Sequence, residues 1–174
     1  RIQPDKWADF AAENGFRYLI FTTKHHDGFC MWDSKYTDFK ADRDYIREVL
    51  EAFRAEGIRT GLYYSLLDWH HDQFTVDNLH PLAAGNREEL NKNRDQRKYC
   101  EYMRNQITEL LTEYGQIDVM WFDYTYPKDG KCAEDWEAEE LLKLIRRLAP
   151  DILIDDRLGL PGSADFQSPE QYVP

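Results

Sequence analysis

Ile117-Asp118-Val119-Met120-Trp121-Phe122-Asp123 is the stretch of sequence on which the fold depends. Apolar residues dominate this run, which is too short and too aromatic for a helix, and Gly115 before it is typical of a helix end. We therefore expect a buried strand that ends on the carboxylate of Asp123. Parallel α/β proteins bind substrates at the carboxyl edge of their strands, so Asp123 is a candidate nucleophile or base. The alternative role for this carboxylate is to cap the following turn.

Predicted helices and strands alternate on both sides of this run. Helices are expected at residues 4–14, 44–56, 95–114 and 133–148, and strands at residues 17–23, 58–65, 117–123 and 151–155. Strict alternation predicts a parallel sheet with right-handed crossovers. No glycine-rich phosphate loop is present, and each strand leads into a polar or aromatic loop. We therefore expect an α/β protein of the (β/α)8 TIM-like barrel class, with about four consecutive βα units in this chain.

Composition limits the kinds of partner. The 174 residues carry 33 acidic and 22 basic side chains, a formal net charge of −11, which argues against nucleic acid as a partner. No apolar run is long enough for membrane insertion. Aromatic residues make up 14% of the chain, and aromatic side chains suit sugars and other flat ligands. The three cysteines lie far apart and show neither zinc spacing nor a disulfide framework.

Polar residues follow each predicted strand, and neighbouring parallel strands would bring them to one cavity. They are Lys24-His25-His26-Asp27-Gly28-Phe29 at the first strand, Tyr63-Tyr64-Ser65 with Asp68-Trp69 at the second, Trp121 and Asp123 at the third, and Asp155-Asp156-Arg157 with Asp165 and Glu170 at the fourth. The long loop at residues 66–93 is expected to form a lid or a binding rim.

The adjacent histidines His25 and His26 allow three interpretations. Neighbouring residues on a strand point to opposite faces, so both would bind one metal ion only from a turn. One imidazole could instead order the loop through a backbone carbonyl, or the pair could hydrogen-bond a polyhydroxylated ligand. We assign no metal ligands, because the remaining histidines show no helical HExxH spacing.

Asp123 and Glu170 form a candidate catalytic pair. Hydrolysis of a glycosidic bond needs one carboxyl group to attack or to activate water, and a second to protonate the leaving oxygen. The two residues are 170 − 123 = 47 positions apart, one βα unit and part of the next loop. Many such pairs exist among 33 acidic residues, and a solvated loop residue is the simpler interpretation of Glu170.

Several motifs closely resemble the α-L-fucosidases of glycoside hydrolase family 29. They are Lys24-His25-His26-Asp27-Gly28-Phe29 followed by Trp32-Asp33-Ser34-Lys35-Tyr36-Thr37-Asp38-Phe39, Gly61-Leu62-Tyr63-Tyr64-Ser65 with Asp68-Trp69, Trp121-Phe122-Asp123, and Asp156-Arg157 followed by Asp165-Phe166-Gln167-Ser168-Pro169-Glu170. The matches keep their order and cover nearly the whole chain. The first block is specific, because a KHHDGF run with a trailing WDSKYTDF is hard to reach by chance.

The resemblance implies an exo-acting, retaining α-L-fucosidase that needs no metal or organic cofactor. Asp123 matches the nucleophile, which would form a covalent fucosyl-enzyme, and Glu170 matches the acid/base of some members. Many members carry glycine directly after the nucleophile, whereas this chain has Tyr124.

The resemblance also assigns residues that bind the sugar. His25 and His26 match ligands of the sugar hydroxyls. Tyr64, Trp121 and Arg157 match residues that line the fucose pocket, and Trp32 could stack on the sugar ring or on its methyl group.

The expected context is a larger protein. Residues 1–174 would be part of one catalytic barrel domain, with the N-terminal strand, the end of the barrel and a C-terminal β-sandwich absent. The partner would be a fucosylated oligosaccharide or glycoconjugate, met in a secreted, periplasmic or lysosomal compartment. The alternatives are an inactive fucose-binding relative and a metal-dependent hydrolase built on His25, His26 and Asp123.

Overall fold

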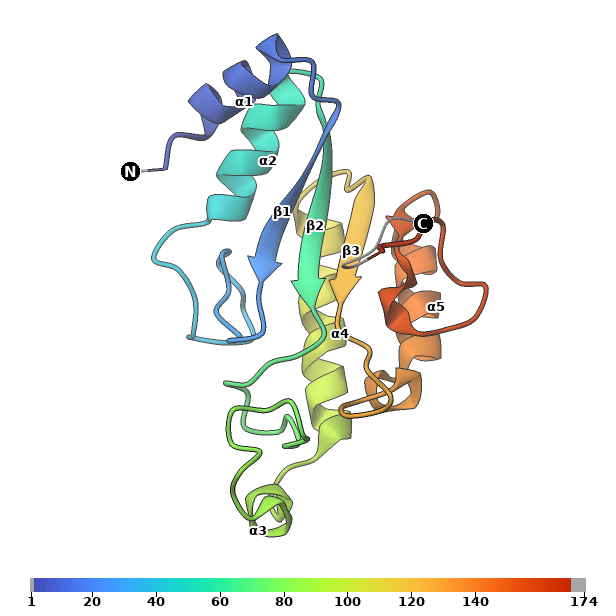
Figure 1. The fold of residues 1–174 in the computed structure, drawn as a ribbon. Helices are drawn as coiled ribbons and strands as arrows, with labels where there is room; N and C mark the ends of the chain where they lie inside the picture. The colour runs from blue at the N-terminus through green and yellow to red at the C-terminus, as the bar shows by residue number, and fades with distance from the viewer. Residues whose placement is uncertain (1, 170–174) are drawn as a thin grey trace.

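The computed structural model describes residues 2–169 and shows a parallel sheet with helices packed against it (Figure 1). The elements in chain order are α1 (Pro4–Glu13), β1 (Tyr18–Lys24), α2 (Tyr45–Ala55), β2 (Arg59–Ser65), α3 (Arg87–Asn91), α4 (Gln96–Glu113), β3 (Val119–Asp123), the 3₁₀ helix η1 (Ala133–Trp136), α5 (Ala138–Leu148), β4 (Leu153–Ile154) and the 3₁₀ helix η2 (Asp156–Leu158). The predicted order of strands and helices is confirmed.

The four strands lie in the order β1-β2-β3-β4, and all the pairs are parallel. Gly61 of β2 pairs with Val119 of β3, and the register continues to the pair Ser65 and Asp123 at the carboxyl edge. The loops that follow β1, β2 and β3 extend beyond this edge, on the same side as α3 (Figure 1). The parallel α/β class is therefore confirmed, and the carboxyl edge is the side where the loops gather.

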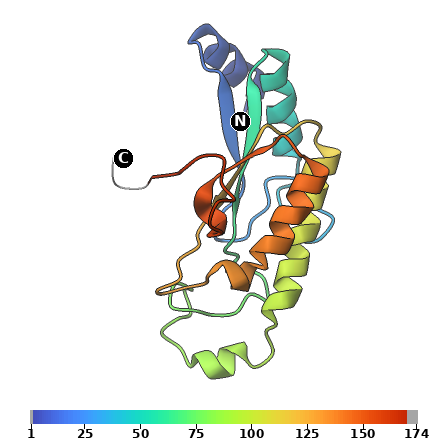
Figure 2. The ribbon, with the colours of Figure 1, turned by 90° about the vertical axis from the view of Figure 1, so that its right-hand side faces the viewer.

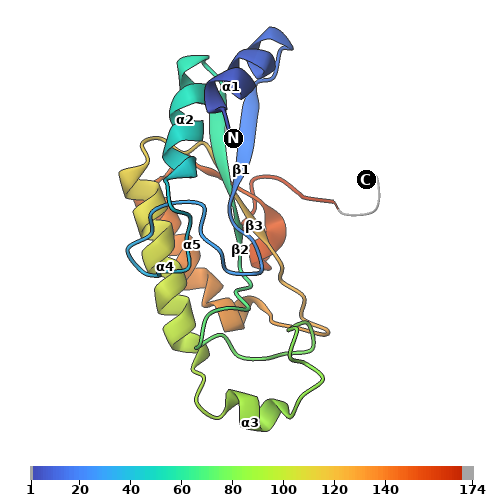
Figure 3. The ribbon, with the colours of Figure 1, turned by 90° about the vertical axis from the view of Figure 1, so that its left-hand side faces the viewer.

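Helices α2, α4 and α5 cover one face of the sheet, which we call the covered face. Figures 2 and 3, which view the chain from opposite sides, both place α4 and α5 on one side of the sheet and the C-terminal segment on the other. The strand residues Leu62, Tyr64, Met120 and Phe122 point into the covered face and have no exposed surface. They pack in one apolar core with the inner sides of α4 and α5. This packing holds the strands rigidly and so fixes where their carboxyl ends lie.

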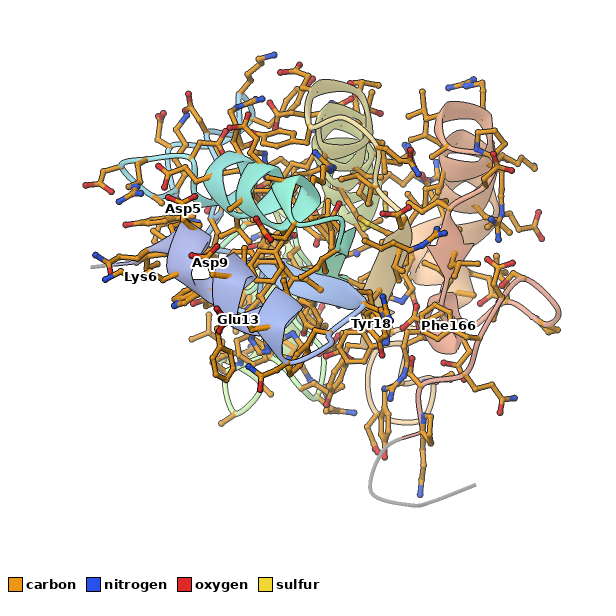
Figure 4. All side chains as sticks on the ribbon, turned by 90° about the horizontal axis from the view of Figure 1, so that it is seen from above. Asp5, Lys6, Asp9, Glu13, Tyr18 and Phe166 are labelled. Carbon is orange, nitrogen blue, oxygen red and sulfur yellow. The ribbon has the colours of Figure 1, made fainter. Side chains whose placement is uncertain are left out.

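The opposite face, which we call the uncovered face, carries no α-helix of the described chain. Tyr18 of β1 is 62% exposed and Leu153 of β4 is 49% exposed. Both border a cavity of about 680 Å³ that Phe166 also lines, at the amino ends of the strands. Figure 4 looks onto this end, with the labelled Tyr18 and Phe166 on the same side and the polar residues of α1 turned outward.

Two local features differ from the sequence prediction. The helix expected at residues 133–148 is broken at Glu137, whose φ of 50° lies in the left-handed region and separates η1 from α5. The loop at residues 66–93 contains the short helix α3, which is capped by the preceding Asn86, whose side chain accepts a hydrogen bond from the Glu89 N–H. Neither feature follows from apolar periodicity, since the capping and turn geometry decides both.

Candidate functional site

Asp123 is the last residue of β3 and stands at the centre of the carboxyl edge. Its Oδ2 accepts a hydrogen bond of 2.7 Å from the hydroxyl of Tyr63 on the neighbouring strand. His26 Nε2 lies 4.0 Å from the same oxygen, and Arg157 lies 3.7 Å from Oδ1. We call Asp123, Tyr63, His26, Arg157 and Trp121 the carboxylate cluster. The side chain of Asp123 remains 19% exposed, so a ligand can reach it.

His26 is held in place by a hydrogen bond and by contacts with two aromatic rings. Its Nδ1 shares a hydrogen bond of 2.6 Å with Ser65 Oγ, and its ring meets the rings of Trp69 and Tyr124 edge-on. Burial, together with the neighbouring His25, lowers the pKa of His26 to about 4. The imidazole is therefore neutral near pH 7 and forms no salt bridge with Asp123 there. The 4.0 Å between Nε2 and Asp123 is too long for a hydrogen bond and leaves this ring nitrogen available to a ligand hydroxyl.

His25 is exposed and lies beside the cluster. Its ring centroid is 4.0 Å from that of His26, and the ring stacks on Tyr63 at 5.6 Å with an interplanar angle of 7°. Both histidines come after the end of β1, which stops at Lys24, so the turn brings them to the same side. The structure thus brings together two neighbours that a continuous strand would have separated.

A β-bulge produces this change of direction. The register of β1 against β2 shifts between Thr22 and Lys24, so that Lys24 lies opposite Tyr64. The bulge turns Lys24 into the covered face, where its Nζ is fully buried, 4.5 Å from the Tyr64 ring and 2.9 Å from Asp68 Oδ2. Bulges next to functional sites often re-aim side chains in this way. Asp68 is 1% exposed and also accepts the His71 backbone N–H at 2.9 Å within its own loop, while its pair with Lys24 joins this loop to the end of β1.

Trp121 and Arg157 reach the cluster from β3 and η2. The ring of Trp121 lies 5.1 Å from that of Tyr63, and its Nε1 donates a 2.5 Å hydrogen bond to Ser168 Oγ. Arg157 donates to the backbone carbonyl of Ser168 at 2.7 Å. Trp121 and Arg157, which were predicted to line the sugar pocket, therefore lie beside Asp123, the predicted nucleophile.

Two predicted sugar-binding residues lie elsewhere. Trp32 has no exposed surface and donates through Nε1 to Glu109 Oε2 at 2.7 Å, so the expected stacking on a sugar is wrong. Tyr64 is also fully buried in the covered face, where its hydroxyl donates to Gln106 Oε1 at 2.7 Å. The physical reason is the alternation of a strand, which sends Tyr63 to the cluster and Tyr64 to the opposite face.

The sequence interpretation gave no role to Tyr63, which it named only among the residues at the end of the second strand, or to Ser168. The sequence carries no signal that puts Tyr63 beside Asp123, because this follows from the pairing of Ser65 with Asp123 across β2 and β3. Ser168 had no such signal either, since its contact with Trp121 joins residues 47 positions apart through a loop.

Tyr124, directly after Asp123, has φ of 87°. This is the left-handed region that favours glycine, and a tyrosine held there is strained. The ring of Tyr124 meets His26 edge-on at 5.1 Å between centroids. The side chain therefore forms a wall beside Asp123 at a position where glycine would leave open space.

The acidic residues after β4 that could act with Asp123 lie in different surroundings. Asp155 is fully buried, and burial raises its pKa to about 7. Asp165 pairs with Arg146 at 2.6 Å, away from the cluster. Asp156 Oδ1 lies 3.9 Å from Arg157 Nε. The prediction for Glu170 lies outside the described residues.

Residues 2–169 contain no metal-binding cluster. No three histidine, cysteine or acidic side chains of this range are grouped so that they could hold a metal ion. Cys30, Cys100 and Cys132 are free thiols. None of the helices in the same range is long and apolar enough to cross a membrane.

These features define a class, a parallel α/β protein with a reachable carboxylate among histidine, arginine and aromatic side chains, as in sites that bind and hydrolyse glycosides. The sequence model of the family "Alpha-L-fucosidase" matches residues 1–174. The chain belongs to the α-L-fucosidase family.

Relatives and solved structures agree with this membership. "Alpha-L-fucosidase 1" of Arabidopsis thaliana is 31% identical over 93% of this chain and 32% of its own length, and human "Tissue alpha-L-fucosidase" is 28% identical over 91% and 33%. The structure of alpha-L-fucosidase isoenzyme 1 from Paenibacillus thiaminolyticus superimposes with a TM-score of 0.90 at 45% identity, over 98% of this chain and 44% of that one. Alpha-L-fucosidase AlfC from Lactobacillus casei, solved with the product alpha-L-fucose, gives a TM-score of 0.81 at 31% identity, over 98% and 56%. The chain spans about a third of the length of these curated relatives.

Proposed function

We propose that the protein containing this chain is a retaining exo-α-L-fucosidase. The observation that carries the proposal is the setting of Asp123, whose carboxylate is oriented by the Tyr63 hydroxyl at 2.7 Å and is reachable from solvent. Family membership supplies the substrate class, since one relative, AlfC, was solved with α-L-fucose and, as its D200A variant, with Fuca(1,6)GlcNAc.

The proposed reaction proceeds in two displacements. In the first, an Asp123 oxygen forms a bond to C1 of fucose while the bond from C1 to the leaving oxygen breaks, and Glu170 gives that oxygen a proton. In the second, water attacks C1, Glu170 takes its proton, and the bond between C1 and Asp123 breaks. Tyr63 stabilises the carboxylate as it leaves, through the same hydrogen bond. For this mechanism the carboxyl groups of Asp123 and Glu170 should lie about 5–5.5 Å apart.

The remaining residues of the cluster would bind the sugar. The neutral His26 can accept a hydrogen bond from a hydroxyl or donate one to it, according to its tautomer. The exposed His25 beside it offers a second imidazole. Trp121 presents an aromatic surface suited to the apolar methyl group or ring face of fucose. This mixture of imidazole and aromatic groups suits a small sugar that has both polar and apolar parts.

We also propose that residues 1–174 form part of a single (β/α)8 barrel domain. The uncovered face, with its cavity of about 680 Å³ and the exposed Tyr18 and Leu153, would then be the barrel interior at the amino ends of the strands. The remaining strands and a C-terminal β-sandwich would lie outside this chain. A secreted, periplasmic or lysosomal location fits a fucosylated glycan substrate.

The decisive experiment uses an aryl α-L-fucoside and the full-length protein. Asp123→Gly should lower kcat by about a thousandfold or more, because the nucleophile is removed. Added azide should restore turnover and give β-fucosyl azide, since a small anion can enter the space left by the carboxylate.

Asp151→Gly is the matched control, because Asp151 is an exposed aspartate on the turn before β4. It should keep the parent activity. Full activity in Asp123→Gly would refute the proposed nucleophile. A folded parent that binds L-fucose without turnover would instead establish the inactive fucose-binding relative.

A further inference from the structure

Ser168 is the point at which three parts of the site meet. Its Oγ accepts the Trp121 Nε1–H at 2.5 Å and donates to Asp155 Oδ2 at 3.2 Å. Its backbone carbonyl accepts from Arg157 at 2.7 Å, and its backbone N–H donates to Asp156 Oδ1 at 3.1 Å. All the polar groups of this one loop residue are therefore engaged, and their partners lie on β3 and on the segment after β4.

Two of these partners, Trp121 and Arg157, lie next to the proposed nucleophile Asp123. Trp121 lies two positions before Asp123 on β3, and Arg157 lies 3.7 Å from Asp123 Oδ1. Asp155 anchors the arrangement from the core, because it is fully buried and its Oδ1 accepts the Phe122 backbone N–H at 3.1 Å. Movement of Ser168 would thus displace both Trp121 and Arg157, the two residues that it bonds near Asp123.

The serine hydroxyl suits this place for a chemical reason. A serine hydroxyl can accept one hydrogen bond and donate another, so Ser168 can join the Trp121 N–H to a carboxyl oxygen of Asp155. Ser168 accepts from Trp121 and donates to Asp155, which completes a chain that ends on the backbone of β3. Alanine at this position would leave both the indole N–H and the buried carboxylate oxygen without this partner.

We propose that Ser168 is a positioning residue, which holds Trp121 and Arg157 against Asp123 by hydrogen bonds from its side chain and its backbone. It does not touch the reacting atoms, and its effect on turnover would pass through Trp121 and Arg157. The same contacts fix the chain two positions before Glu170. The effect on catalysis rests on the proposed fucosidase function, whereas the hydrogen bonds themselves do not.

The first test compares variants of the full-length protein on an aryl α-L-fucoside. Ser168→Ala should lower kcat/KM by about tenfold, the size expected for losing one or two hydrogen bonds. Ser168→Thr keeps the hydroxyl and should recover most of the activity. Ser163→Ala is the matched control, because Ser163 lies in the same loop and, among residues 2–169, its Oγ bonds only to the nearby Leu160 carbonyl, at 2.8 Å.

A double-mutant comparison separates positioning from general loosening. Trp121→Phe keeps an aromatic ring but removes the N–H, so it should reduce kcat/KM through the same contact as Ser168→Ala. The double variant should then lose less than the product of the two single losses. Full additivity, or equal activities of Ser168→Ala and Ser163→Ala, would overturn the proposal.

A spectroscopic test stands apart from fucosidase activity. The indole N–H resonance of Trp121, identified by its loss in Trp121→Phe, should exchange slowly with solvent in the parent and rapidly in Ser168→Ala. Ser163→Ala should leave it unchanged. An inactive parent with a protected Trp121 N–H would refute the proposed function alone. An unprotected N–H in an active parent would refute the role of Ser168 alone.

Discussion

Tyr63 and Tyr64 are neighbours in β2, yet they serve opposite faces of the same sheet. Tyr64 points into the covered face, where it is fully buried and hydrogen-bonds Gln106. Tyr63 points to the uncovered face and hydrogen-bonds Asp123. The covered face contains side chains that hold the strands together, and the uncovered face contains side chains that a ligand can meet. The comparison teaches that one position along a strand decides whether a polar aromatic residue supports the fold or the site.

The largest effect should come from the buried ion pair on the covered face. Lys24→Met would leave the Asp68 carboxylate buried without its cation, at a cost of about 3–5 kcal/mol in the free energy of unfolding. Urea denaturation of the full-length protein measures this loss. Lys143→Met is the matched control, because Lys143 pairs with Glu140 on the exposed surface of α5, and it should cause no measurable loss. Equal midpoints for the two variants would contradict the structural role given to Lys24.

A smaller effect is expected from Trp32, which the sequence placed at the sugar and the structure places in the core. Trp32→Phe removes the hydrogen bond to Glu109, which is 4% exposed, and should reduce the free energy of unfolding by about 2 kcal/mol. The kcat/KM for the aryl fucoside should stay unchanged at a temperature where the variant is folded. A raised KM with unchanged stability would restore the stacking role and refute this assignment to the core.

The two tyrosines give the sharpest test of the comparison. Tyr63→Phe should lower kcat/KM by about tenfold with little change in stability, because the Asp123 carboxylate loses its orienting hydroxyl. Tyr64→Phe should reduce the free energy of unfolding by about 1 kcal/mol and leave kcat/KM unchanged. Each variant is the control of the other, since the chemical change is the same. Reversed results would mean that the two faces have been assigned the wrong way round.

The sequence predicted the order of elements, the parallel sheet and the location of Asp123 at a strand end, because periodicity and turn residues carry that information. It did not predict that Tyr63 rather than Tyr64 reaches Asp123, because this depends on register. Nor did it predict that Lys24 turns inward, because the bulge between Thr22 and Lys24 arises from pairing with β2. Side-chain placement across strands is a tertiary property, and a local pattern does not contain it.

Two titrating groups beside the nucleophile strand, the part-buried His26 and the buried Asp155, extend the comparison. Burial lowers the pKa of His26 to about 4, so the unfolded chain binds more protons at this residue, and stability rises as pH rises from about 4 to 6.5. Burial raises the pKa of Asp155 to about 7, so the folded chain binds more protons there, and stability falls as pH rises from about 3.8 to 7. The two contributions oppose each other over nearly the same range.

The smallest expected effect is therefore the sum of these two contributions. Together they should change the free energy of unfolding by less than about 1 kcal/mol between pH 4.5 and 6.5. Each single variant should expose the other contribution. Relative to the parent, Asp155→Asn should gain stability as pH rises, because the opposing group is gone, and His26→Asn should lose it. Thermal unfolding of the full-length variants at pH 4.5, 5.5 and 6.5 measures both differences. Subtracting the parent removes the contributions of His71 and His80, whose pKa values burial also lowers. Curves that stay parallel to the parent would show that neither His26 nor Asp155 changes its proton affinity on folding.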